Sequence, residues 1–155
     1  MDFKTLANQY RNELLDNVLP FWLEHSQDLE FGGYFTCLDR KGGVFDTDKF
    51  IWLQGREVWM FSMLYNKVEK RQEWLDCAVQ GGEFLKKYGH DGNYNWYFSL
   101  DRSGRPLVEP YNIFSYTFAT MAFGQLSLAT GNQEYADIAK KTFEIILSKV
   151  SNPKG

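Results

Sequence analysis

Residues 35–43 read "FTCLDRKGG", and residues 97–105 read "YFSLDRSGR". The two stretches share a Leu-Asp-Arg-x-Gly core at an offset of 62 positions. Asp and Gly suit the tight turn of a β-hairpin, so each copy is predicted to be a short hairpin. In the first copy the strands are expected at 34–38 and 43–46.

The same offset relates the segments that flank the hairpins. Trp22 maps onto Phe84, and Phe61 maps onto Phe123. Glycine-containing turns also precede both copies, as "EFGGY" and "HDGNY". An offset that survives across helix, loop and helix indicates a structural repeat.

Each repeat unit is predicted to be a helix, a hairpin and a second helix. The apolar residues recur at helical spacing over 4–26, 50–68, 72–88 and 112–130, and 134–150 begins a third unit. The helices at 4–26, 72–88 and 134–150 carry charges on one side, as surface helices do. Those at 50–68 and 112–130 are apolar or small nearly all round, which predicts that they are buried.

Exposed and buried helices that alternate at a fixed period are typical of an all-α toroid, an αα-barrel in which outer helices surround a ring of inner ones. Residues 1–155 are expected to form one domain, with the hairpins on one rim. Two and a half units cannot close a ring. The chain is therefore expected either to be a piece of a longer protein or to assemble with another copy, and to expose apolar surface on the helix of the third unit.

Composition narrows the class of protein. The 155 residues are 44% hydrophobic and 24% charged, as in a globular domain. A net charge of −3 with no basic cluster gives no support to a nucleic-acid partner. The N-terminal segment is charged throughout and suits neither a signal peptide nor a membrane span, so a cytoplasmic protein is expected. Cys37 and Cys77 are expected to be free thiols, and no metal site is predicted.

The segment "FIWLQGREVWMFSM", 50–63, holds one arginine in an otherwise aromatic and apolar run. Helical spacing places Trp52, Arg56 and Trp59 on one stripe. A charge on so apolar a helix needs a partner. Arg56 is therefore either a structural residue, paired with Glu57 or a helix C-terminus, or a donor in a functional site.

Three stretches carry a resemblance to a known family. "FWLEHSQD", "GGYFTCLDR" and "WLQGREVWM" occur in this order, and "NIFSYTFATMAF" follows them. Together they resemble the N-terminal part of the N-acylglucosamine 2-epimerase family, over essentially the whole chain but only the first two-fifths of a family member. The resemblance implies an (α/α)6 barrel of twelve helices, which agrees with the toroid predicted from the repeat.

The resemblance also implies an activity. Family members interconvert N-acylglucosamine and N-acylmannosamine, so a small amino sugar is the expected ligand and a homo-oligomer the expected assembly. No cofactor is required, although ATP activates many members. The terminal "SNPKG" resembles the start of a Lys/Gly-rich loop that has been linked to nucleotide binding in the family.

Inversion at C2 removes a proton beside a carbonyl, which needs a base, an acid and a donor for the oxygen that becomes negative. Arg56 suits the donor role because its planar guanidinium stays charged. The resemblance places it in the active site, so Arg56 is the predicted catalytic residue, with Trp52 and Trp59 as walls for the sugar. The family's acid and base are two histidines in its C-terminal half. His25 and His90 are expected to be cap and turn residues instead.

Three further residues are predicted to bind substrate. Phe114 and Ser115 are the repeat equivalents of Trp52 and Leu53, although Phe114 is as readily a plain core residue. Tyr111, just before the same helix, is a weaker candidate.

A rival interpretation belongs to another class of protein. A half-toroid without catalysis would bind carbohydrate or protein, or would form oligomers. Continuation of the coding sequence past Gly155, with the missing histidines, would favour the enzyme.

Overall fold

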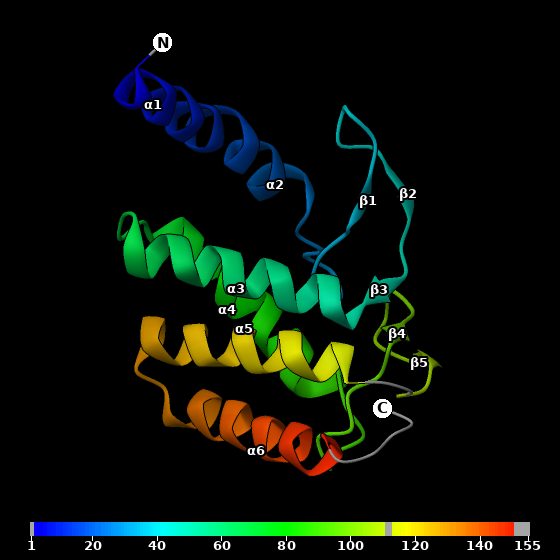
Figure 1. Cartoon of the computed structure of the whole chain (residues 1–155). Helices are drawn as coiled ribbons and strands as arrows, with labels where there is room; N and C mark the ends of the chain where they lie inside the picture. The colour runs from blue at the N-terminus through cyan, green and yellow to red at the C-terminus, as the bar shows by residue number, and fades with distance from the viewer. Residues whose placement is uncertain (1, 111–112, 151–155) are drawn as a thin grey trace.

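The computed structural model describes residues 2–110 and 113–150 (Figure 1). Helices dominate, and the strands are short. In chain order the elements are α1 (Phe3–Glu13), the π-helical η1 (Leu14–Val18), α2 (Leu19–His25), β1 (Cys37–Leu38), β2 (Val44–Asp46), β3 (Lys49–Phe50), α3 (Ile51–Lys67), α4 (Gln72–Tyr88), β4 (Ser99–Leu100), β5 (Pro106–Val108), α5 (Phe114–Thr130) and α6 (Gln133–Lys149).

The first helix predicted from the sequence is one continuous helical stretch made of α1, η1 and α2. The residues at both junctions keep right-handed helical backbone angles. Asp2 caps the start, because its carboxylate accepts a 2.7 Å hydrogen bond from the N–H of Thr5. Pro20 lies in the first turn of α2, where its missing N–H costs least. α1 buries none of its residues.

The two hairpins confirm the repeat. β1 pairs with β2, and β4 with β5, in the same antiparallel register and with an irregularity at the same place. Gly42 and Gly104 occupy equivalent turn positions, with φ of 83° and 94°. These left-handed values favour glycine. The observed strands fall within or next to the predicted ones.

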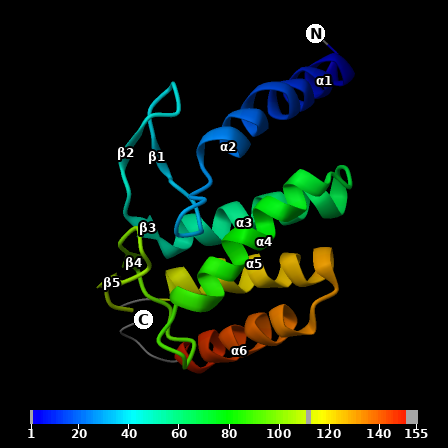
Figure 2. The same ribbon diagram turned by 180° about the vertical axis from the view of Figure 1, so that it is seen from behind.

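The inner helices α3 and α5 lie side by side and run in the same direction (Figures 1 and 2). The outer helices α4 and α6 run in the opposite direction. Both hairpins lie at the starts of α3 and α5, on one rim, as predicted. β3 pairs with β4, so the rim also joins the two units through backbone hydrogen bonds.

The core lies between α3, α4 and α5. The inner helices approach closely at Gly55, where an added Cβ would come within 3.0 Å of the backbone of Phe118. The fully buried core side chains include Val58 and Phe61 from α3, Trp74 and Leu85 from α4, and Tyr116, Ala119, Phe123 and Leu126 from α5.

One expectation from the sequence was wrong. The inner helices are not buried all round, because Met121 and Leu128 of α5 are 42% and 70% exposed. The described helices form an arc rather than a ring, so one side of α5 has no helix against it. Phe143 and Leu147 on α6 are also exposed, which agrees with the apolar surface predicted for the third unit.

Candidate active site

The glycine turn of the first unit is fixed onto the start of α3 by one side chain. Gln54 is fully buried. Its Oε1 accepts from the N–H of Tyr34 and its Nε2 donates to the carbonyl of Tyr34, both at 2.8 Å. Gly33 has a φ of 71°, and a Cβ there would collide with Gln54. The "GGY" and "WLQG" segments are therefore locked together at this rim.

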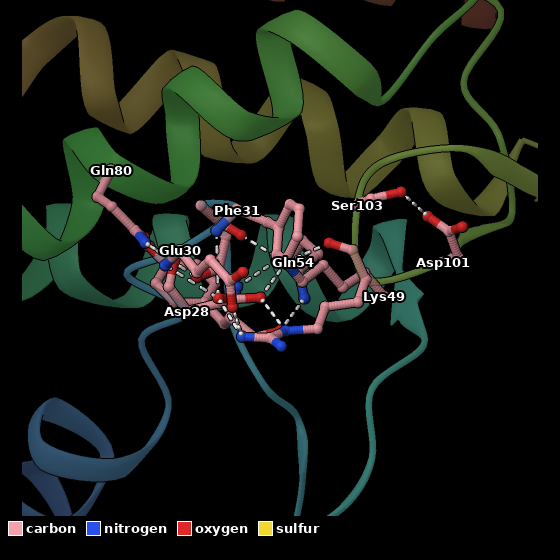
Figure 3. Close-up of polar contacts among 12 residues, drawn as sticks. Asp28, Glu30, Phe31, Lys49, Gln54, Gln80, Asp101 and Ser103 are labelled. Atoms are coloured by element: carbon pink, nitrogen blue, oxygen red, sulfur yellow. Dashed lines mark hydrogen bonds and ion pairs between the residues drawn. The ribbon is translucent and has the colours of Figure 1, made fainter.

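A buried charge cluster holds the same rim (Figure 3). Asp28 and Lys49 have no exposed surface, and Lys49 Nζ donates to Asp28 Oδ2 at 2.9 Å. Lys49 also donates to the backbone carbonyls of Gly32 and Arg102. Arg102 donates hydrogen bonds to both oxygens of Asp28, from Nε to Oδ2 at 3.0 Å and from Nη2 to Oδ1 at 3.1 Å. We call Asp28, Lys49 and Arg102 the Asp28 cluster.

The Asp28 cluster holds one anion and two cations, and Glu30 supplies the second anion through a 3.0 Å ion pair with Arg102. Burial acts to raise the pKa of Asp28, but hydrogen bonds from Arg102 and Lys49 outweigh it and lower this pKa to about 2. Burial lowers the pKa of Lys49, and Asp28 opposes that shift. The cluster joins the first glycine turn, β3 and the second hairpin. Sequence reasoning missed it, although each member lies beside a quoted motif.

Arg56 lies on the second turn of α3 with its side chain exposed. Its guanidinium carbon is 5.8 Å from the ring centroids of both Trp52 and Phe118. The expected neighbours were Trp52 and Trp59, so the second aromatic was predicted wrongly. The close approach of α5 to α3 at Gly55 brings Phe118 to this position instead. Such cation–π contacts stabilise and orient a guanidinium without consuming its N–H donors.

Arg56 does not pair with Glu57. In the described chain Arg56 has no ion pair, and the neighbouring Glu57 is hydrogen-bonded to Ser26. One form of the structural alternative for Arg56, an ion pair with Glu57, is therefore wrong. The guanidinium keeps its donors available on an open face.

An aromatic cluster lies beside Arg56. The ring of Trp52 lies 5.6 Å from that of Phe114 and 6.0 Å from that of Phe118, and the two phenylalanines are 5.1 Å apart. Phe114 is 46% exposed, so it is not a plain core residue. Ser115 is only 2% exposed, so its side chain is buried. Tyr111 lies outside the described residues.

Trp59 lines a pocket beside this cluster. The pocket measures about 250 Å³ and lies between α2, the residue before β1 and α3. Trp22 and Met60 form apolar walls, and Arg56 stands at one side. The remaining lining residues are Thr36, Leu53 and Glu57. Of the predicted residues, the structure thus gathers Arg56, Trp52 and Phe114 in the aromatic cluster, with Trp59 in the adjoining pocket.

His90 has the turn role expected of it, whereas the C-cap residue of α2 is Ser26 and not His25. His25 is the last residue of α2, and its ring packs 4.9 Å from that of Phe21. His90 Nδ1 accepts a 3.0 Å hydrogen bond from the N–H of Gly92, inside the second glycine turn. Across residues 2–110 and 113–150, no three His, Cys, Asp or Glu side chains gather as metal ligands. None of the helices in these ranges could cross a membrane.

The fold and this rim define the class of protein as a sugar epimerase-like α/α-toroid. The solved structure of cellobiose 2-epimerase from Bacillus thermoamylovorans superposes with a TM-score of 0.86 at 30% identity, covering 97% of this chain and 39% of that one. Cellobiose 2-epimerase of Dictyoglomus turgidum is 28% identical over 158 residues, which is 100% of this chain and 40% of that protein.

The particular family follows from the sequence comparison. The N-acylglucosamine 2-epimerase (GlcNAc 2-epimerase) family model matches residues 33–155, and the chain belongs to this family. N-acylglucosamine 2-epimerase of Bos taurus is 44% identical over 146 residues, which is 91% of this chain. The chain spans about a third of the length of that relative, 35%.

Proposed function

We propose that these residues form part of the sugar pocket of an N-acyl-D-glucosamine 2-epimerase, which interconverts N-acylglucosamine and N-acylmannosamine. Family membership and the 44% identity to N-acylglucosamine 2-epimerases support the reaction. The main structural support for this site is the exposed guanidinium of Arg56, which lies over the rings of Trp52 and Phe118.

The chemistry assigns a role to each of these side chains. Removal of the C2 proton from the open-chain aldehyde places negative charge on the carbonyl oxygen, and return of a proton to the opposite face inverts C2. Arg56 donates to that oxygen as the charge develops. Trp52 and Phe114 offer aromatic faces to the apolar side of the sugar. His25 lies at the end of α2 and His90 in the second glycine turn, and neither is assigned the acid or base role here.

This proposal has further parts. The protein is cytoplasmic, as expected from its charged N-terminal segment. By the family resemblance, it works as a homo-oligomer and responds to ATP as an activator, with no cofactor required. The "SNPKG" segment that suggested nucleotide binding lies outside the described residues. An ATP titration of the rate at fixed sugar concentration tests this part.

The reaction is tested by hydrogen exchange at C2. The complete gene product that contains these residues is incubated in D2O with N-acetylmannosamine, N-acetylglucosamine or cellobiose. Proton NMR should show deuterium at C2 and the interconverted epimer for the two N-acyl sugars. Exchange with cellobiose alone would assign the disaccharide reaction instead, and exchange with none of the three would reject the epimerase.

A second function is favoured by one observation. α1 buries no residue and exposes Phe3 and Tyr10 at 93% and 70%. A helix that presents apolar side chains in this way suits an assembly or binding module without catalysis. Binding of N-acyl sugars without C2 exchange would support this alternative.

A further inference from the structure

One buried carboxyl group lies beside Arg56 without a countercharge. Glu57, on α3, is 7% exposed and lines the same pocket. In residues 2–110 and 113–150 its one hydrogen-bond partner is Ser26, the C-cap residue of α2, and it makes no ion pair. Burial of an unpaired carboxylate is costly, so this site favours the neutral acid.

The contacts of Ser26 show where the proton of Glu57 lies. Ser26 Oγ is 2.5 Å from Glu57 Oε1 and 2.6 Å from the backbone carbonyl oxygen of Trp22. A hydroxyl has one hydrogen, and the carbonyl can only accept, so an ionised Glu57 would compete with the carbonyl for that hydrogen. With a proton on Oε1, Glu57 donates to Ser26, and Ser26 donates to Trp22. Both short contacts are then hydrogen bonds.

The groups on the elements packed around Glu57 do not supply a positive charge. Tyr34, from the first glycine turn, and Cys77, from α4, face Glu57, and burial raises the pKa of both, so they stay protonated and neutral. Arg56, on the same helix, is directed over two aromatic rings of the site. His25, on α2, packs against an aromatic ring of its own helix. Burial therefore dominates and raises the pKa of Glu57 to about 8, although its hydrogen bond acts to lower it.

The contact between Glu57 and Ser26 joins the N-terminal helical stretch to the inner helix α3. α1 and η1 bury none of their residues, and Leu19 is the one buried residue of α2. Figures 1 and 2 show this stretch lying apart from α3 at α1 and approaching it at α2. Among the described residues, the contact is the one side-chain hydrogen bond between the end of this stretch and α3. It is therefore well placed to control how α2 sits on α3.

We propose that neutral Glu57 is a proton-dependent latch, which holds the end of α2 against α3 through Ser26. Trp22, on α2, and Arg56, on α3, line the same pocket. The latch thus fixes one wall of the pocket relative to the other, and Glu57 is a positioning residue. This inference goes beyond the proposed reaction and does not depend on it.

A proton held in the closed form makes the latch weaken as the pH rises. In an open form the carboxyl of Glu57 has its ordinary pKa of 4.5, whereas the closed form keeps its proton up to about pH 8. The stabilisation of the closed form is therefore complete below pH 4.5 and is lost as the pH rises towards 8. The equilibrium constant for opening should grow by up to about tenfold per pH unit in this window and level off above it.

Hydrogen–deuterium exchange measures this opening in the complete gene product. Exchange of the backbone N–H groups of α2 is followed by mass spectrometry from about pH 5.5 to 9, and exchange of α6 in the same samples is the internal reference. Each variant is compared with the parent at the same pH, so that the pH dependence of the chemical exchange step cancels. Melting curves report whether each variant is folded.

Glu57→Gln is the decisive variant because its NH2 can donate to Ser26 at every pH. The ratio of α2 exchange in the parent to that in Glu57→Gln should rise by up to about tenfold per pH unit until about pH 8 and then stay level. Glu24→Gln, an exposed change on α2, is the matched control and should follow the parent. Ser26→Ala breaks the chain of hydrogen bonds but keeps the carboxyl, so α2 should exchange faster than in the parent at every pH.

Three results would overturn the inference. A ratio between parent and Glu57→Gln that does not change with pH would show that the closed form holds no extra proton. An equal change in α6 would place the effect in global unfolding rather than in a latch on α2. Parent-like exchange of α2 in Ser26→Ala would show that the hydroxyl does not hold this helix. If Glu57→Gln fails to fold, the Ser26→Ala comparison decides alone.

Discussion

At the scale of single residues, the position of the candidate site depends on buried side chains at the start of α3. Arg56 is open to solvent, but α3 begins two residues after Lys49, whose ammonium is fully buried against Asp28. The charged cluster thus holds the end of the helix that presents the guanidinium. An arginine that stabilises a developing charge needs a fixed backbone position, because a misplaced donor stabilises the transition state less.

Acid titration should reveal the Asp28 cluster. Asp28 has a depressed pKa, so its contribution to stability is present above the ordinary value of 3.8 and is lost as pH falls towards 2. The shift corresponds to about 2.5 kcal/mol of unfolding free energy. Urea unfolding between pH 6 and 2 measures it. In Asp28→Asn this pH-dependent part should be absent, so the difference in stability between parent and variant should shrink as the pH falls towards 2.

The same variant tests the cluster at neutral pH. Asp28→Asn leaves the Lys49 ammonium buried without its anion, and breaking a buried pair costs about 3–5 kcal/mol. Asp76→Asn, an exposed change on α4, is the matched control and should alter stability little. Equal midpoints for the two variants would contradict the cluster's structural role.

Sequence reasoning placed Trp52 beside Arg56 but missed Phe118, and both outcomes have one reason. The helical period places Trp52 on the same stripe as Arg56. Phe118 is on another helix, and no local sequence pattern in either segment predicts the distance between the two helices. The Asp28 cluster was missed in the same way, because its three charges come from separate segments of the chain.

At the scale of elements, the bounds of the helices followed from the sequence. The predicted helix at 72–88 was found as α4, and the one at 50–68 as α3 with one residue less at each end. These limits are set by local signals, such as Gly89 after α4 and the aromatic strand before α3. The two hairpins were predicted from the repeated turn chemistry, whereas their register was not.

The contact between Tyr34 and α4 gives an element-scale prediction. Tyr34 is fully buried, and its hydroxyl donates to the carbonyl of Cys77 at 2.7 Å. A Cβ at Gly81 would collide with the Tyr34 ring. Gly81→Ala should therefore destabilise the protein by about 1–3 kcal/mol through overpacking, despite alanine's better helix propensity.

Gly124→Ala is the matched control on α5. A Cβ there meets nothing within 4 Å, so the substitution should stabilise the helix by about 0.5–1 kcal/mol. Chemical denaturation of both variants gives the comparison. A Gly81→Ala protein as stable as Gly124→Ala would show that the turn does not pack against α4 as described.

At the scale of the whole molecule, the arc of helices leaves apolar faces uncovered. The sequence predicted this surface on the third unit because two and a half units do not close a ring. It did not predict that one side of α5 would be open, because an apolar helix pattern says nothing about which neighbours are present. Open faces occur on α1, α5 and α6, as Figures 1 and 2 show for the arrangement of these helices.

The 155-residue chain should therefore self-associate and bind a hydrophobic dye. Phe143 and Leu147 lie one helical turn apart on α6 and are 49% and 56% exposed. Replacing both with glutamate should weaken association and lower dye fluorescence, whereas Glu144→Gln on the same helix should not. Sedimentation velocity gives the molar mass. A monodisperse, dye-silent parent monomer would contradict the prediction.

The central claim is that Arg56 stabilises the negative oxygen formed when C2 of an N-acyl hexosamine loses its proton. The most direct test is the rate of C2 deuterium exchange into N-acetylmannosamine by the complete gene product carrying Arg56→Ala, with melting temperature measured on the same protein. Loss of one such donor should lower kcat roughly 10²–10³-fold at an unchanged melting temperature. Arg56→Lys should keep stability but not rate, because lysine lacks the planar fork. Near-normal exchange by Arg56→Ala, with a melting temperature several degrees lower, would contradict the account.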